Sequence, residues 1–388
     1  MKIGLIVPGF SASEADWCIP ALLNLVRALS RVHQVHVFTL RYPHQRGRYS
    51  VHGASVHAFA GGLASGFGRL PLLTRALAGV VAEARRGAFD VLHGVWADEP
   101  GFVAVTAARL LGIPAIMSVA GGELVGFTDI GYGGQLSRLN RWLIRRALHA
   151  AQQVTVGSHL LGEQVAAYGA GGALGARLAV VPLGVDVRQF TPDAGRWETA
   201  RQPASKSRPA RLLHVASLAP VKDQATLLRA FAQVVAASEG TSTLRLDLVG
   251  DGPLRQPLQA LAKTMGIGAH VHFHGAIPHQ QLPDLYRAAD LCLLTSRYES
   301  QNLAVLEAAA CGAPVVGTTV GVVPELAPPD CTAAVGDAGA LAEAIQRLLA
   351  DDKRRIHLGQ MQCELVRRRF ALECTVEKLE GLYDTVTR

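Results

Sequence analysis

The sequence predicts an α/β protein of two domains, each with parallel strands that alternate with helices. Its 388 residues exceed the usual size of a single hydrophobic core. Short apolar runs of strand length alternate with longer segments that lack a helix breaker, and such runs are typical of parallel strands buried on both faces. The alternation stops once near the middle of the chain and then restarts, which indicates two domains rather than one.

The interruption gives the expected domain boundaries. Residues 191–209 carry three prolines, several arginines and few apolar side chains, a composition typical of a linker. We therefore expect a first domain over residues 1–190 and a second over residues 210–370. Residues 371–388 form a helical tail that is expected to pack back on the first domain.

The expected elements of the first domain follow from apolar periodicity and breakers. The strands are residues 2–7, 34–39, 89–93, 113–119 and 153–158. The helices are residues 17–30 or 20–30, 72–86, 101–111, 135–151 and 159–168. Residues 169–175 are rich in glycine but do not follow a strand, so they do not fit a dinucleotide-binding fingerprint.

The second domain shows the same pattern more clearly. Its expected strands are residues 211–216, 243–249, 270–274 and 290–295, with a further strand starting at Val315. Its expected helices are residues 225–237, 257–265 and 303–310, and residues 340–388 are largely helical. Polar loops follow several strands, and ligands of open α/β sheets gather at the carboxyl ends of strands.

The strongest functional signal lies between Thr295 and Val316. Asn302 is a favourable N-cap for the helix at 303–310, so the first backbone amides of that helix would point toward the end of the preceding strand. This predicts an anion site. Glu299 lies in the loop and Glu307 about one and a half turns into the helix.

Two carboxylates beside a phosphate would be repelled by it, so they are better suited to bind hydroxyl groups. A ribose and a sugar ring both carry such hydroxyls, and a phosphate between two rings of this kind describes a nucleotide sugar. The alternative is that Glu299 is solvated and that Glu307 lies on the helix surface.

Glu299, then Glu307 after seven intervening residues, then Ala-Ala-Ala-Cys-Gly-Ala-Pro-Val-Val resembles the donor motif of retaining glycosyltransferases of the family 4 type. That family has the GT-B fold, in which two Rossmann-like domains face each other across a cleft. The resemblance implies a UDP- or GDP-sugar donor on the second domain and an acceptor on the first. It implies neither a cofactor nor a metal ion.

The resemblance also implies roles for individual residues. Glu299 would contact the transferred sugar, Glu307 the ribose hydroxyls, and Lys222 the leaving diphosphate. Further positions assigned to the nucleotide sugar are Ser217, Gly250, Gly275, Ile277, Ser300, Gln301, Asn302 and Leu303. The family carries an arginine where this chain has Ser217, and Arg297 is a candidate to supply the missing positive charge.

On the acceptor side, His93 is the candidate catalytic residue because it ends a predicted strand. The alternative is a structural histidine. The family often has a second histidine at the position of Val95, and a His-Gly pair where this chain has Ala120 and Gly121, so the match is weaker here.

The first strand-to-helix loop also departs from the family, because the Gly-Gly pair often found there is missing. Asp16 and Trp17 occupy this loop, and Glu123 follows the strand at residues 113–119. These three residues are candidates for contact with an acceptor, which the resemblance suggests to be a glycan, a lipid-linked molecule or a small molecule.

The net charge of +7 restricts the partners. The excess lies almost entirely in residues 1–195, which favours an anionic acceptor or an anionic membrane surface. Nucleic acid is not favoured because the basic residues do not interleave with aromatic ones. The basic amphipathic helix at residues 135–151 could lie on anionic lipid, and the alternative is an ordinary surface helix.

The localisation follows from what the chain lacks. The apolar run at the N-terminus is too short for a signal peptide, and no apolar segment of membrane-spanning length is present. We expect a cytoplasmic protein, with peripheral contact to the inner membrane face as an option.

Metal binding is not expected. His270, His272 and His274 alternate, but three histidines on one strand are too close-set for good tetrahedral geometry. The six cysteines have no zinc-like spacing and are expected to be reduced thiols, and the chain contains no Asp-x-Asp motif.

The leading hypothesis is thus a hexosyltransferase that retains anomeric configuration. A nucleotide-sugar epimerase of similar fold is one alternative and would form product from donor alone. A sugar-nucleotide-binding module without transfer is another, motivated by Ala120 and Ser217, and would bind donor without consuming it.

Overall fold

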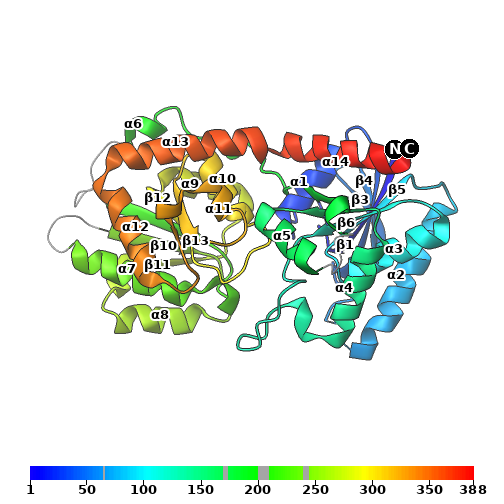
Figure 1. Cartoon of the computed structure of the whole chain (residues 1–388), viewed down its shortest axis with the longest axis horizontal. Helices are drawn as coiled ribbons and strands as arrows, with labels where there is room; N and C mark the ends of the chain where they lie inside the picture. The colour runs from blue at the N-terminus through cyan, green and yellow to red at the C-terminus, as the bar shows by residue number, and fades with distance from the viewer. Residues whose placement is uncertain (64–65, 169–173, 200–208, 239–243) are drawn as a thin grey trace. The chain divides into compact units, whose positions relative to one another are not determined.

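The computed structural model describes residues 1–63, 66–168, 174–199, 209–238 and 244–388. The chain divides into two compact units. Unit 1 consists of Met1–Gly184 and Leu372–Arg388, and unit 2 of Val185–Ala371. Each unit contains a mainly or wholly parallel sheet flanked by helices, so the predicted class of two α/β domains is confirmed (Figure 1).

Unit 1 is built on an eight-stranded sheet with the order β3-β4-β2-β1-β5-β6-β7-β8, parallel except for β3. The strands are β1 (Lys2–Gly9), β2 (Gln34–Tyr42), β3 (Gly47–Val51), β4 (Ala54–Ala58), β5 (Val91–Val95), β6 (Ala115–Val119), β7 (Gln153–Val156) and β8 (Leu178–Val180). The helices are α1 (Pro20–Leu29), α2 (Arg69–Ala84), α3 (Glu99–Leu111), α4 (Arg138–Ala150), α5 (His159–Tyr168) and α14 (Leu372–Thr387), with 3₁₀ helices η1 (Gly66–Gly68), η2 (Gly134–Leu136) and η3 (Gly175–Arg177).

Both faces of this sheet are covered, which explains why β1 is a nearly continuous apolar run. Ile3, Leu5 and Val7 face a core shared with α1 and α14, whereas Ile6 faces the core on the opposite side. The C-terminal helix α14 belongs to this unit and packs against α1 and β5. Its Tyr383 is fully buried.

Unit 2 has a six-stranded parallel sheet with the order β11-β10-β9-β12-β13-β14. Its strands are β9 (Ala210–Val215), β10 (Leu244–Val249), β11 (Val271–Gly275), β12 (Leu291–Leu294), β13 (Val315–Thr318) and β14 (Thr332–Ala333). Its helices are α6 (Arg196–Thr199), α7 (Gln224–Ala237), α8 (Arg255–Thr264), α9 (Leu282–Ala288), α10 (Leu303–Ala310), α11 (Val323–Leu326), α12 (Ala338–Ala350) and α13 (Asp352–Arg369), with 3₁₀ helices η4 (Pro220–Lys222), η5 (Gly268–His270), η6 (His279–Gln281) and η7 (Pro329–Cys331).

The strand order of unit 2 determines where a ligand can bind. The first strand, β9, lies between β10 and β12, so the chain builds the sheet outward in both directions from β9. In an open α/β sheet the loops separate at such a switch point, and ligands bind there at the carboxyl edge.

The predicted strand at residues 89–93 is displaced by two residues. β5 pairs with β1 from Val91 to Gly94 and with β6 up to Val95, so neighbouring strands set its bounds. His93 consequently lies in the middle of β5 rather than at its end.

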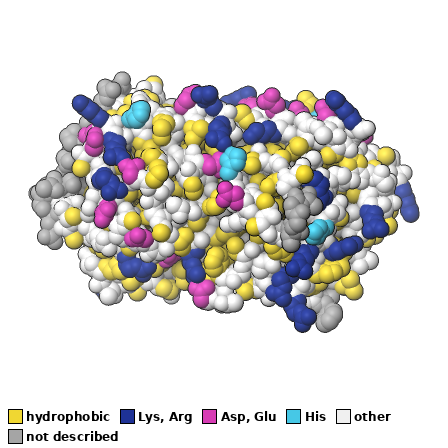
Figure 2. Space-filling view, in the orientation of Figure 1, with side chains coloured by type: hydrophobic (Ala, Val, Ile, Leu, Met, Phe, Trp, Pro, Cys, Tyr) yellow, Lys and Arg dark blue, Asp and Glu magenta, His cyan; other side chains and the backbone are white. Residues whose placement is uncertain are grey.

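The basic helix α4 packs on unit 1 through one face and exposes the other. Leu143, Ile144 and Leu148 are buried in unit 1, as in an ordinary surface helix, while Trp142 is 51% exposed beside the arginines. Dark blue Lys and Arg side chains gather over this region in Figure 2. No described helix is both long and apolar enough to span a membrane. Contact with an anionic membrane surface stays a prediction.

The first part of the expected linker is packed on unit 2. Arg196 is 5% exposed and donates hydrogen bonds to the carbonyl oxygens of Gly312, Arg287 and Ala289 at 2.7–3.3 Å. These carbonyls lie just past α10 and at the end of α9, where helices lack internal donors. Residues 200–208 lie outside the described part of the chain.

Replacing Arg196 with alanine should therefore destabilise unit 2. The variant leaves buried carbonyls without their donor, so we expect the free energy of unfolding to fall by about 3 kcal/mol. Denaturant unfolding measures this. The matched control is Arg229→Ala on the exposed face of α7, expected to change stability by less than about 0.5 kcal/mol. Equal effects of both variants would contradict the role of Arg196.

Candidate active site

Adjacent strands bring together two loops that are far apart in sequence. β9 and β12 are parallel neighbours, with Leu212 opposite Leu291 and Leu213 opposite Cys292. Their carboxyl ends therefore lie at the same edge of the sheet. The loop after β9 carries Lys222, and the loop after β12 carries Glu299.

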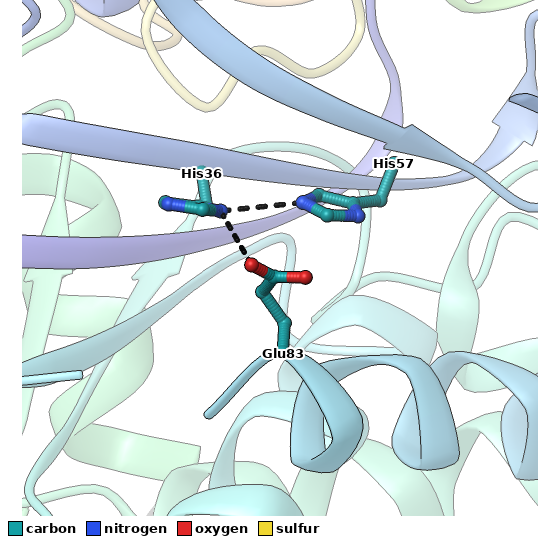
Figure 3. Close-up of side chains that lie close together, drawn as sticks. All are labelled: His36, His57 and Glu83. Atoms are coloured by element: carbon teal, nitrogen blue, oxygen red, sulfur yellow. Dashed lines mark hydrogen bonds and ion pairs between the residues drawn. The ribbon is translucent and has the colours of Figure 1, made fainter. Parts of the chain in front are cut away.

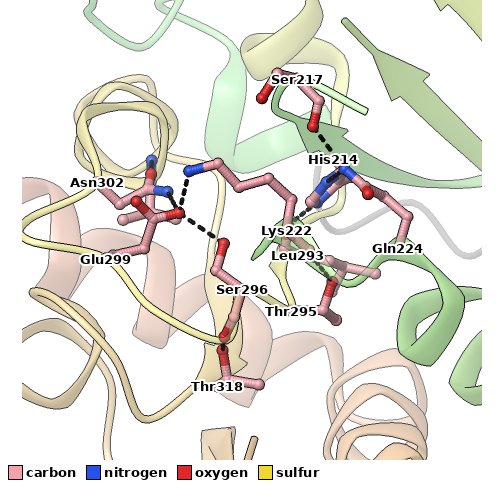
Figure 4. Close-up of polar contacts among 11 residues, drawn as sticks. His214, Ser217, Lys222, Gln224, Leu293, Thr295, Ser296, Glu299, Asn302 and Thr318 are labelled. Carbon is pink, nitrogen blue, oxygen red and sulfur yellow. Dashed lines mark hydrogen bonds and ion pairs between the residues drawn. The ribbon is translucent and has the colours of Figure 1, made fainter. Parts of the chain in front are cut away.

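Lys222 and Glu299 form an ion pair at this edge. Lys222 Nζ lies 2.6 Å from Glu299 Oε1, and the side chains are 21% and 10% exposed. The same carboxylate oxygen accepts hydrogen bonds from Ser296 Oγ at 2.6 Å and Asn302 Nδ2 at 2.9 Å (Figure 4). The two residues that were assigned separate roles from the sequence are thus direct partners in the structure.

Neighbouring residues fix both loops. Thr295 Oγ1 donates to the carbonyl oxygen of Lys222 at 3.0 Å, which ties the lysine to the end of β12. Thr318 Oγ1 donates to the carbonyl oxygen of Ser296 at 2.8 Å, which ties the second loop to β13. Hydrogen bonds from the strand ends therefore hold both loops that carry the ion pair.

His214 and Gln224 are buried residues that also support these loops, and the sequence did not predict this role. His214 lies in β9, is fully buried, and bonds through Nδ1 to the carbonyl oxygen of Leu293 at 2.9 Å. Burial lowers the pKa of His214 to about 4, so the ring is neutral and Nδ1 donates. Gln224 lies 3.3 Å from its other nitrogen and also donates to the carbonyl oxygen of Ser217. A polar residue inside an apolar run was the available signal.

The predicted cap of α10 is present. Asn302 accepts a hydrogen bond from the amide of Val305 at 3.0 Å, and its backbone has a φ of 79°. This left-handed conformation is uncommon outside glycine, although asparagine tolerates it best. The first amides of α10 have no acceptor inside the helix. The cap residue Asn302 donates through Nδ2 to Glu299 Oε1, so the helix begins beside the ion pair, and its first amides make this edge suitable for an anion.

Glycines let the other loops of this edge pack closely. Gly250 has a φ of 127°, and a Cβ atom there would lie 1.9 Å from the carbonyl oxygen of Ala216. Its amide donates to the carbonyl oxygen of Gly275 at 2.8 Å, which joins the ends of β10 and β11. Ile277 follows in the loop after β11. Gly275 is the last residue of β11, and the other predicted residues follow strands at the carboxyl edge of this sheet: Ser217, Gly250, Ile277, Ser300, Gln301, Asn302 and Leu303.

Glu307 is enclosed within unit 2. The residue is 4% exposed, and it accepts hydrogen bonds from His279 Nε2 at 2.6 Å and Tyr286 Oη at 3.1 Å. Both carboxylate oxygens are thus already engaged inside unit 2. The alternative of a helix-surface Glu307 is wrong, and its contact with ribose stays a prediction.

His93 of unit 1 is a packed histidine in this structure. It is 1% exposed, with Nδ1 2.8 Å from Tyr383 Oη and Nε2 2.7 Å from Ser118 Oγ. Burial lowers its pKa to about 4. The expectation that His93 ends its strand is wrong, and its contacts join β5 to β6 and α14, which favours the structural alternative.

The acceptor candidates Asp16, Trp17 and Glu123 follow β1 and β6 of unit 1. Asp16 accepts from the Ala12 amide and from Tyr42 Oη, and Trp17 is half-buried against the core. Glu123 is 4% exposed and accepts from three backbone amides of the loops after β5 and β6, at 2.6–3.1 Å. It fastens these loops, and any contact of the three residues with an acceptor stays a prediction.

The alternating histidines do not form a metal cluster within the described part of the chain. His270 lies in η5 and bonds to the Leu244 carbonyl oxygen, while His274 pairs with Asp247 at 2.6 Å. Among the described residues, a different set of possible metal ligands converges in unit 1. It consists of His36, His57 and Glu83.

Two family models match this chain. The model for glycosyl transferases group 1 matches residues 195–362, and the model for Glycosyltransferase Family 4 matches residues 21–189. The chain therefore belongs to the glycosyltransferases of the family 4 type, as the Glu299–Glu307 motif indicated.

Individual relatives agree with this assignment. The chain is 28% identical to N-acetyl-alpha-D-glucosaminyl L-malate synthase of Bacillus anthracis, over 92% of this chain and 91% of that protein. It is 28% identical to a GDP-mannose-dependent phosphatidylinositol monomannoside mannosyltransferase of Mycobacterium tuberculosis, over 74% of each. A sucrose-phosphate synthase structure from Thermosynechococcus elongatus superposes with a TM-score of 0.79 and 22% identity, over 99% of this chain and 98% of that one, and shows the shared fold.

The buried His93 predicts a pH dependence of stability. Its pKa of about 4 lies below the value of 6.5 expected in the unfolded chain, so the unfolded state binds the proton more readily. Its contribution is complete above about pH 6.5 and is lost progressively as the pH falls toward 4, by up to about 3 kcal/mol.

His93→Leu should lower stability at every pH yet show a smaller further loss between pH 6.5 and 4 than the wild type. Denaturant unfolding across this range measures both. The control is His149→Leu on the exposed end of α4, which should keep the wild-type pH profile. A His93→Leu profile parallel to the wild type would rule out this titration.

Proposed function

We propose that this glycosyltransferase moves a hexose from a nucleoside diphosphate sugar to an acceptor hydroxyl, with retention of configuration and without a metal ion. The observation that supports this most directly is the Lys222–Glu299 pair beside the first turn of α10. A lysine, a carboxylate and the start of a helix lie together at the switch point of unit 2, and we assign the carboxylate to the hydroxyls of the sugar.

The proposed step needs charge stabilisation more than a protein base. Negative charge develops on the diphosphate as the sugar leaves, and we assign its neutralisation to Lys222 together with the α10 amides. We propose that the leaving phosphate itself receives the acceptor proton. The protein then positions the substrates and neutralises the charge on the leaving diphosphate. We propose that Lys222 does this in place of a metal ion.

We propose only the chemical class of the donor and of the acceptor, and not the individual molecules. One relative is named for GDP-mannose and another for an N-acetylglucosaminyl product, so family membership leaves the base and the sugar open. The acceptors in these two names, malate and a phosphatidylinositol mannoside, are both anionic. Together with the positive charge of residues 1–195, they support an anionic acceptor on unit 1.

A thermal-shift panel of UDP- and GDP-sugars tests the donor, because a ligand that binds the folded state raises the unfolding temperature. The best donor is then incubated with anionic and neutral acceptors in the presence of a chelator, and NMR of the product reports its anomeric configuration. Product from donor alone would indicate an epimerase. Binding without turnover would indicate a non-catalytic module. An inverted product, or loss of turnover in chelator at an unchanged unfolding temperature, would contradict the proposal.

Glu299 and Glu307 should have separable effects. We expect Glu299→Gln chiefly to lower turnover, because contact with the moving sugar matters most in the transition state. Glu307→Gln keeps the size of the side chain and should chiefly weaken nucleotide binding. Calorimetry with UDP and GDP, alongside steady-state kinetics, separates the two. Unchanged nucleotide affinity in Glu307→Gln would contradict the ribose role.

Lys222→Ala should reduce turnover with the fold intact. A fixed donor that stabilises developing charge commonly contributes about 3 kcal/mol, so we expect a loss of roughly 100-fold or more in kcat. The variant also removes the ionic partner of Glu299, which retains Ser296 and Asn302.

The control is Lys263→Ala on the exposed face of α8, which should leave kcat unchanged. Ser217→Arg in the Lys222→Ala background should recover part of the loss, because Ser217 is exposed at the same edge. If Lys222→Ala stays within about threefold of wild type, below what one such donor contributes, the phosphate site lies elsewhere.

A further inference from the structure

Three side chains of unit 1 converge from separate elements, and none of them belongs to the candidate active site described for unit 2. His36 lies in β2, His57 in β4 and Glu83 near the end of α2 (Figure 3). β2 and β4 are parallel neighbours with Phe38 opposite His57. Since side chains alternate along a strand, His36, Phe38 and His57 share one face, and α2 packs on that face.

The three side chains already stand at metal-ligand spacing. His36 Nδ1 lies 3.2 Å from His57 Nε2 and 3.9 Å from Glu83 Oε1, and all three ligand atoms lie within 4.8 Å of one another. In tetrahedral zinc sites with bonds of about 2.0–2.1 Å, neighbouring ligand atoms are roughly 3.3 Å apart. Small movements would therefore allow all three atoms to reach one ion.

We propose that His36, His57 and Glu83 bind a zinc ion that joins β2, β4 and α2. Two imidazoles and a carboxylate are a ligand set that zinc uses in proteins, and three protein ligands leave a fourth position for water. The residues are only 5%, 7% and 8% exposed, so the site is enclosed by the sheet and α2.

The protonation of the histidines suits a metal. Burial lowers the pKa of His57 to about 4 and also lowers that of His36, so both rings are neutral near pH 7. Neutral imidazole is the form that binds metal. In this structure one ring donates a hydrogen bond to the other across the 3.2 Å contact. Zinc binding requires that proton to move to the outer nitrogen of its ring, with no change in net protonation.

Neighbouring cations compete with the ion. Glu83 is 3.1 Å from Arg86 and 3.5 Å from Arg48, whose side chains are 60% and 53% exposed, and Lys2 also lowers the pKa of His36. Exposed ion pairs contribute little to stability, so a divalent ion can displace these guanidinium groups from Glu83. The competition should nevertheless limit zinc affinity.

Titration of the tag-free 388-residue chain with Zn²⁺ against a chromophoric chelator tests the site. We expect one equivalent to bind to the wild type and to raise its unfolding temperature. His57→Gln should lower zinc affinity by at least about 100-fold, and Glu83→Gln, which preserves shape, by at least about 10-fold. The matched control is His272→Gln on the exposed face of β11, which should bind like the wild type.

Arg48→Ala separates loss of a ligand from damage to the fold. Removing a competing cation should strengthen zinc binding severalfold, which a destabilised protein would not show. The proposal is overturned if the wild type binds no zinc, if His57→Gln and Glu83→Gln bind like the wild type, if His272→Gln abolishes binding, or if Arg48→Ala fails to strengthen it. Should His57→Gln not fold by circular dichroism, Glu83→Gln and Arg48→Ala decide the question.

Discussion

The parallel pairing of β9 with β12 is the constraint on which the candidate active site depends. The two strands are separated by more than 70 residues of chain, and only their pairing puts the loops after them at one edge. Lys222 and Glu299 can then meet at 2.6 Å. Buried His214 bonds to the carbonyl oxygen of Leu293 in the neighbouring strand, and that contact resists any change in this pairing.

The sequence predicted the elements of unit 2 well because local chemistry fixes them. The helix at Leu303–Ala310 begins after a capping asparagine and ends before Gly312 and Pro314, and its bounds were predicted correctly. The same local signals identified Lys222, Glu299 and Asn302 individually. Their contacts with one another depend on strand order, which no local pattern contains.

Residues of unit 1 were harder to interpret for the same reason. His93 was assigned to a strand end by its own neighbours, whereas pairing with β1 and β6 extends the strand beyond it. Glu123 was a candidate for acceptor contact because it follows a strand, but its carboxylate accepts hydrogen bonds from backbone amides of two loops. His36, His57 and Glu83 come from three elements, so their convergence could not be found before the fold was known.

The Lys222–Glu299 ion pair also determines how the proposed donor would bind. In the absence of ligand each charge compensates the other, and this avoids leaving either one unpaired in a partly buried site. A diphosphate is the stronger partner for the lysine, since it carries more negative charge, while the hydroxyls of a sugar can donate to the carboxylate that the lysine leaves. Ser296 and Asn302 hold Glu299 in place during that exchange.

Neither half of the donor is sufficient alone. A nucleoside diphosphate without sugar would draw Lys222 away from Glu299 and leave the carboxylate facing added negative charge. Under the proposed function, this arrangement would favour the intact nucleotide sugar over the product diphosphate and so promote release of the product after transfer.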